Sequence, residues 1–139
     1  FEVDGEFGGI GPDMAVGDIA PQPSRKEAAM MLDATEGANT TIAIVATDAP
    51  LNKTQCHRFA VTAHDGMARA IVPSHTPLDG DLVFGVATGE DGQVNQTQFR
   101  AIAAAGAVCL SRAIARGVYE ATTAPDDIIP TYRELNGLG

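Results

Sequence analysis

Apolar residues along the chain follow two kinds of spacing, one typical of strands and one typical of helices. Residues 40–47 form a short run rich in Thr, Ile and Val, which predicts a buried strand, and residues 82–88 predict a second strand. From residue 51 to residue 71 apolar side chains recur every three or four positions, which predicts a helix with one apolar stripe. Residues 96–122 predict a long helix whose many alanines allow close packing on a neighbour. The order strand, helix, strand, helix indicates a layered α/β fold.

The first 39 residues have a different character. They are rich in Gly and Pro, which is typical of loop, and only residues 24–35 predict a short helix, with Ser24 and Glu27 as a capping box. The composition changes near Asn39. Two strands form a poor sheet alone, so we expect that further strands come from elsewhere. The sequence does not decide whether residues 125–139 pack on the domain.

Length and charge narrow the class of protein. A chain of 139 residues with 45% hydrophobic residues suits one compact domain, and its net charge of −9 disfavours nucleic acid or anionic lipid as partners. We expect no apolar stretch of membrane-spanning length and no secretory leader, hence a soluble cytoplasmic protein. Because Phe1 stands where a Met is expected, we expect an incomplete chain. Cys56 and Cys109 predict buried free thiols rather than a disulfide.

The junction of Asn39 and Thr40 is the first candidate for chemistry. In the ordinary interpretation, Thr40 only caps the strand that follows it. Alternatively, attack of the Thr40 hydroxyl on the Asn39 carbonyl would cut the chain and give Thr40 a free α-amine. Such an amine titrates near pH 8 when unperturbed, so at neutral pH it can accept the hydroxyl proton and activate its own residue as a nucleophile.

Asp79 and Asp81 flank Gly80 at the entry to the second predicted strand. Acids beside a glycine in a loop are usually solvated turn formers. Two close carboxylates can also orient an ammonium group or raise one another's pKa. The residues alone leave both interpretations open.

The three histidines do not predict a metal site. His57 and His64 are seven residues apart on one predicted helix, so they lie two turns from each other, and His75 lies in the loop before Asp79. We expect His64, which precedes Asp65, to support local structure. No phosphate-binding glycine loop and no Gly-x-Ser-x-Gly motif occurs. We therefore expect no metal and no cofactor.

Three ordered blocks together resemble a known family. They are residues 39–49 (NTTIAIVATDA), residues 63–71 (AHDGMARAI) and residues 79–84 (DGDLVF), with thirty-nine residues from Thr40 to Asp79. This pattern is similar to the C-terminal part of the DmpA-like family of self-processing N-terminal nucleophile hydrolases, over about residues 30–120. The Asp-Gly-Asp motif resembles the nylon-oligomer hydrolase branch, because the aminopeptidase branch has a serine and a glutamate at these two positions.

The resemblance implies a layered αββα fold, of which this chain is an incomplete C-terminal portion. Residues 1–39 would be the end of a large subunit and the processing linker, and residues 40–139 the small subunit. Cleavage after Asn39 would expose Thr40 as the nucleophile, with Asp79 and Asp81 positioning it. The family's upstream lysine and asparagine have no counterpart in residues 1–39, so the site is incomplete here. The large subunit of the same precursor, further copies in a homo-oligomer and a small amide substrate are the implied partners.

Three functions follow as hypotheses. The first is a self-processing amide hydrolase that cleaves 6-aminohexanoate oligomers or related amides through an acyl-enzyme at Thr40. The second is an aminopeptidase for short peptides, including those with β- or D-residues. The third is a non-catalytic fragment or assembly module whose apolar helices pack against a larger missing part.

Overall fold

A computed structural model describes residues 40–77, 79–127 and 130–138 of the chain. Its elements, in order, are β1 (Ile42–Thr47), α2 (Lys53–Ala70), β2 (Leu82–Ala87), α3 (Gln96–Glu120) and α4 (Tyr132–Leu135). The two predicted strands and two predicted long helices are confirmed, with ends that differ by no more than two residues. The predicted helix over residues 24–35 lies outside the described residues. The chain divides into two compact units, one of residues 38–114 and one that includes residues 115–139.

The first unit is built on a parallel pair of strands. β1 pairs with β2 in a register that runs from Ile42 opposite Leu82 to Thr47 opposite Ala87. The helix α2 connects the two strands, which is the connection that parallel neighbours require. The α/β class is thus confirmed, whereas the layered αββα arrangement stays a prediction.

Helix α2 begins and packs as its sequence dictates. The Asn52 side chain accepts a hydrogen bond from the Gln55 N–H, and the Gln55 side chain accepts one from the Asn52 N–H, which completes a capping box. The apolar stripe of α2 supplies Phe59, Ala63 and Met67 to the core, where each is nearly or fully buried. These three residues therefore fix the face of α2 that turns inward.

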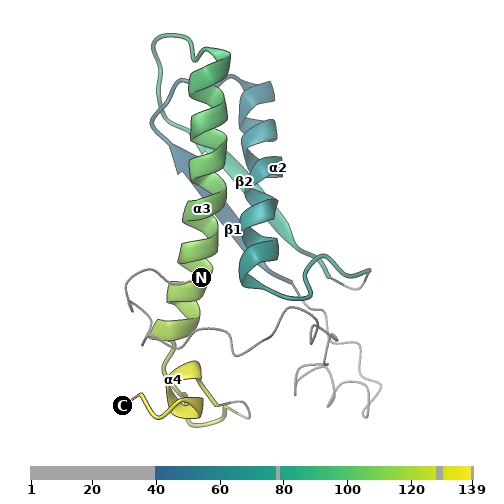
Figure 1. The fold of residues 1–139 in the computed structure, drawn as a ribbon, viewed down its shortest axis with the longest axis vertical. Coiled ribbons are helices and arrows are strands. Elements are labelled where there is room, and N and C mark those ends of the chain that lie inside the picture. The colour runs from purple at the N-terminus through teal and green to yellow at the C-terminus, as the bar shows by residue number, and fades with distance from the viewer. Residues whose placement is uncertain (1–39, 78, 128–129, 139) are drawn as a thin grey trace. The chain divides into compact units, whose positions relative to one another are not determined.

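Helices α2 and α3 lie side by side over the strand pair (Figure 1). Gly66 of α2 lies against the Ala107 backbone, and Gly106 of α3 lies against the Phe59 ring, so closely that a Cβ atom at either glycine would overlap its neighbour. Leu110 of α3 completes the shared core. Gly66 lowers the intrinsic helix propensity of α2, and the close crossing of the two helices explains why a glycine is present there.

The expectation about membrane-spanning length is wrong for one element. Helix α3 has 25 residues and contains an 18-residue window with a mean hydropathy of 1.4, so by length and composition it could cross a membrane. Within the first unit, Ala103, Ala107 and Leu110 of α3 are buried in the core.

Both cysteines are free thiols, as predicted, but Cys56 is only half-buried, and the expected burial is wrong for Cys109, which is exposed on α3. In the second unit, the C-terminal segment contacts the end of α3. The Arg133 guanidinium lies 5.5 Å from the centre of the Tyr119 ring, and Thr131 caps α4 with Glu134 in a capping box.

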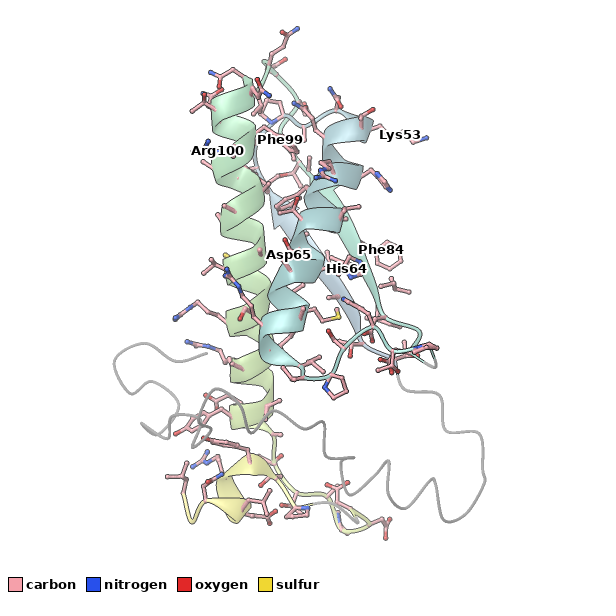
Figure 2. All side chains as sticks on the ribbon, turned by 45° about the vertical axis from the view of Figure 1, so that its right-hand side comes forward. Lys53, His64, Asp65, Phe84, Phe99 and Arg100 are labelled. Atoms are coloured by element: carbon pink, nitrogen blue, oxygen red, sulfur yellow. The ribbon has the colours of Figure 1, made fainter. Side chains whose placement is uncertain are left out.

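One face of the strand pair is apolar and exposed. Ile42 and Ile44 of β1 are 67% and 65% exposed, and Phe84 of β2 is 55% exposed. Figure 2 shows Phe84 projecting from β2 away from α2. A parallel sheet is normally covered on both faces, so this surface has the composition of an interface.

Candidate active site

The predicted site residues meet at the amino ends of the two strands. Thr40 and Thr41 precede β1, and Asp79, Gly80 and Asp81 precede β2. In a parallel pair both strands begin at the same edge, and the register places the first group opposite the second. The structure therefore brings Thr40 to the Asp-Gly-Asp segment, and the roles that the resemblance implies for these residues stay predictions.

Thr40 lies directly over Gly80. A Cβ atom built on Gly80 would lie 2.6 Å from Thr40 Oγ1, which is closer than real Cβ contacts. Thr40 as a whole residue is exposed. The glycine between the two acids thus leaves the space that the Thr40 hydroxyl occupies. Asn39, the other side of the proposed processing point, lies outside the described residues.

Asp81 uses both of its carboxylate oxygens to hold backbone. Its Oδ1 accepts a hydrogen bond of 2.9 Å from the Thr41 N–H, and its Oδ2 accepts one of 3.1 Å from the His75 N–H. The same Oδ2 lies 3.0 Å from His75 Nδ1, and the Asp81 side chain is only 6% exposed. Asp81 therefore joins the start of β1 to the loop before β2.

These contacts stabilise the ionised form of Asp81. Burial by itself would raise the pKa of Asp81, and it is the largest single effect. Hydrogen bonds from the Thr41 and His75 backbone, the positive charge of a protonated His75 ring and the Thr41 side chain together outweigh it and hold the pKa below its usual 3.8. Asp81 is therefore an anion at neutral pH and keeps its role as an acceptor.

Asp79 has a different and more local role. Its Oδ2 accepts a hydrogen bond of 2.6 Å from the Thr76 N–H, and its own N–H donates to the Thr76 carbonyl at 2.9 Å. The two bonds close the turn that leads into Gly80. Asp79 and Asp81 thus both shape the loop below Thr40, but only Asp81 reaches across to β1 among the bonds described.

The structure places two histidines beside this site that sequence reasoning did not connect with it. His64 Nδ1 of α2 lies 3.2 Å from His75 Nε2, and the two rings are in an edge-to-face arrangement with centroids 4.8 Å apart. The prediction that His64 supports local structure with Asp65 missed this contact. Eleven residues separate the two histidines, and no helical or strand spacing indicates that the loop folds back onto α2.

Within residues 40–77, 79–127 and 130–138, no three His, Cys, Asp or Glu residues are placed to hold a metal ion. His57, two turns from His64 on α2, is exposed. The site described here is therefore an array of hydroxyl, carboxylate and imidazole groups. Such an array can hold a nucleophile in place and control where protons reside.

Comparison with known proteins identifies the family. The family model described as peptidase family S58 matches residues 9–127. A protein of Mycobacterium tuberculosis named as an uncharacterised aminopeptidase is 48% identical over 108 residues, which cover 70% of this chain and 31% of that protein. A similarly named protein of Mycobacterium leprae is 41% identical over 110 residues, covering 68% of the chain and 28% of that protein.

A shorter match links the chain to a second group of enzymes. The 6-aminohexanoate-oligomer endohydrolase of Paenarthrobacter ureafaciens is 41% identical over 56 residues, which cover 40% of this chain and 16% of that protein. The chain thus spans less than a third of the length of the curated relatives that it matches. The resemblance to the DmpA-like family is confirmed, and the chain belongs to peptidase family S58.

Proposed function

We propose that the protein of which this chain is part is an amide hydrolase whose nucleophile is Thr40, freed by cleavage of the Asn39–Thr40 bond. The observation that carries the proposal is the position of Thr40 Oγ1 over Gly80, between two aspartates that hold the surrounding backbone. An enzyme is also what the names of the relatives favour, since they are aminopeptidases and endohydrolases.

Processing would begin with attack of Thr40 Oγ1 on the Asn39 carbonyl carbon. As the new C–O bond forms, the Asn39–Thr40 C–N bond breaks and the nitrogen takes up the hydroxyl proton. Water then hydrolyses the ester and leaves a carboxylate on Asn39 and a free α-amine on Thr40. Nucleophile and base are then on the same residue.

Turnover would use the same atoms. The α-amine takes the proton from Thr40 Oγ1, which bonds to the carbonyl carbon of the substrate amide. The amide C–N bond breaks, and the leaving amine takes up the proton. Water hydrolyses the acyl-enzyme ester, the α-amine relays the proton of the water to Oγ1, and Thr40 is restored.

Asp81 supports the reaction by orienting the nucleophile. With its Oδ1 on Thr41 and its Oδ2 on His75, it has little capacity left for a substrate ammonium group. This arrangement favours orientation of Thr40 by Asp81 over binding of a substrate ammonium group by Asp81. The Thr41 bond fixes the residue next to Thr40, so it limits where the α-amine and the hydroxyl can lie.

Two substrate classes remain as candidates. The Asp-Gly-Asp motif and the endohydrolase relatives favour 6-aminohexanoate oligomers or related amides. The longer matches to proteins named aminopeptidase favour short peptides. A capped oligoamide and an N-terminal amino acid anilide distinguish the two: an endo-acting enzyme cleaves the capped substrate, whereas an aminopeptidase needs the free amine of the anilide.

The exposed apolar face of β1 and β2 is consistent with a larger protein around this chain. We propose that strands of the large subunit cover Ile42, Ile44 and Phe84 and so complete a layered αββα fold, with residues 40–139 as the small subunit of a cytoplasmic homo-oligomer. A non-catalytic assembly module would bury the same face but would neither be processed nor turn over.

The test is substitution of Thr40 in the full-length precursor. Thr40→Ala is expected to leave one uncut polypeptide by denaturing intact-mass measurement and to abolish amide hydrolysis. Thr40→Ser is expected to retain part of both activities, because it keeps the hydroxyl. Thr97→Ala, an exposed position on α3, is the matched control and is expected to behave as wild type. Hydrolysis by an uncut Thr40→Ala protein would overturn the proposal.

A further inference from the structure

Three side chains form a continuous chain of polar contacts that starts at the proposed site. Asp81 at the start of β2 contacts His75 in the loop at 3.0 Å, and His75 contacts His64 on α2 at 3.2 Å. In Figure 2, His64 projects from α2 on the side nearer β2. The chain thus connects the strand edge to the helix that covers it.

The proton positions in this chain follow from its inner end. An ionised carboxylate can only accept hydrogen bonds, so His75 Nδ1 must be the donor to Asp81 Oδ2. In neutral His75 the Nε2 atom is then an acceptor, and His64 Nδ1 donates to it. In protonated His75 both ring nitrogens donate, and His64 Nδ1 is then the acceptor, so either state of His75 satisfies both contacts.

The backbone of His75 also contributes a hydrogen bond to Asp81. His75 has a φ of 57°, in the left-handed region where residues other than glycine are uncommon and asparagine is favoured. This conformation lets the backbone N–H and the ring Nδ1 of His75 reach the same oxygen, Asp81 Oδ2.

We propose that His75, held in turn by His64, is a positioning residue that fixes the Asp81 carboxylate on the Thr41 N–H and thereby holds Thr40 for attack. The inference rests on the proposed function, since it takes Thr40 as the nucleophile. It assigns His75 no contact with substrate. Its effect passes through Asp81 to the backbone beside Thr40.

The experiment compares His75→Ala with His75→Asn in the full-length precursor. Alanine removes the ring donor, so processing and kcat are expected to fall about 10- to 100-fold with KM within about twofold. Asparagine tolerates the left-handed backbone and keeps a donor near the Nδ1 position, so it is expected to recover most of kcat. A purely structural role would not produce a loss confined to kcat and recovered by asparagine.

Two further variants locate the path of the effect. His64→Ala is expected to lower kcat by less than His75→Ala, because it leaves the bond to Asp81 intact. In an Asp81→Asn background, His75→Ala is expected to have little additional effect, since both substitutions disrupt the same contact. His57→Ala, exposed on the same helix, is the matched control with wild-type kinetics.

The outcomes separate this inference from the proposed function. A wild-type protein that is cut before Thr40 and loses activity in Thr40→Ala, but keeps full kcat in His75→Ala, overturns the positioning role alone. Equal and additive losses from His75→Ala and Asp81→Asn also overturn it. A wild-type small subunit that begins at a residue other than Thr40 overturns the proposed function itself.

Discussion

The two ends of the strand pair differ sharply in chemistry. At the amino ends of β1 and β2, the Asp81 carboxylate bonds to the backbone of Thr41, forty residues away in sequence. At the carboxyl ends, Thr88 donates its N–H to the Thr47 carbonyl at 3.0 Å, and the Thr47 hydroxyl accepts from the Ala49 N–H at 3.2 Å. One end is held by a buried anion and the other by neutral groups.

The carboxyl end also has a shallow hollow of mostly apolar character. Its lining residues come from the loop after β1, the loop between β2 and α3, and the first turns of α3: Ala49, Pro50, Gln93, Val94, Gln98, Ala101 and Ile102. Open parallel sheets usually bind ligands at their carboxyl ends. In this unit the buried carboxylate of Asp81 lies at the amino ends of the strands instead. The general rule for open parallel sheets would therefore not have predicted the location of the proposed active site.

The strongest test of this difference compares one acid at each end. Asp81→Ala is expected to lower turnover of the full-length protein about 100-fold or more, because Thr41 and His75 lose their acceptor and Thr40 is no longer held. Asp48→Ala, an exposed acid just after β1, is expected to leave turnover unchanged. The measurement is kcat with a chromogenic amide. Equal effects of the two substitutions would remove the distinction between the ends.

A pair of glycines sharpens the comparison. In Gly80→Ala the new methyl group would displace the Thr40 hydroxyl, so turnover is expected to fall about 10-fold or more with little loss of stability. In Gly89→Ala it would overlap the Asp48 carbonyl and the backbone that follows, so unfolding is expected to become easier by about 1 to 3 kcal/mol with kcat unchanged. Chemical denaturation and kinetics on both variants check that Gly80→Ala affects turnover and Gly89→Ala affects stability. A loss of kcat in Gly89→Ala but not in Gly80→Ala would contradict the prediction.

The smallest expected effect is on acid stability. The pKa of Asp81 is lowered in the folded protein, so the stabilisation from its ionised form is fully present above the unfolded value of 3.8. It is lost as the pH falls below 3.8 through the folded pKa. The free energy of unfolding of Asp81→Asn is therefore expected to decrease less steeply than that of wild type over this acidic range. Asp48→Asn, measured alongside, is expected to follow the wild-type curve.

Local pattern was sufficient to predict the main elements. Short apolar runs, rich in β-branched residues in the first case, predicted β1 and β2, and apolar spacing predicted α2 and α3, because these signals act over a few neighbouring residues. The meeting of Thr40 with Asp79 and Asp81 came from family resemblance. It agrees with the parallel register, which aligns residues forty apart.

The histidine pair could not be predicted in the same way. It depends on a left-handed backbone at His75 and on a loop that returns to α2, neither of which leaves a periodic signal. The role of Gly66 could not be predicted either, because the glycine is required by the close approach of the Ala107 backbone on another helix. The contacts that the sequence did not predict are thus those between residues of different secondary-structure elements.

The hydrogen bond between Thr41 and Asp81 has a consequence for what happens once the chain is cut. A newly formed chain terminus normally frays, because nothing upstream restrains it. Here the anchor would lie a single residue from the break. The new amino group of Thr40 could rotate about only a few bonds. Cleavage would therefore yield a terminus that is already held near its final position before the first turnover.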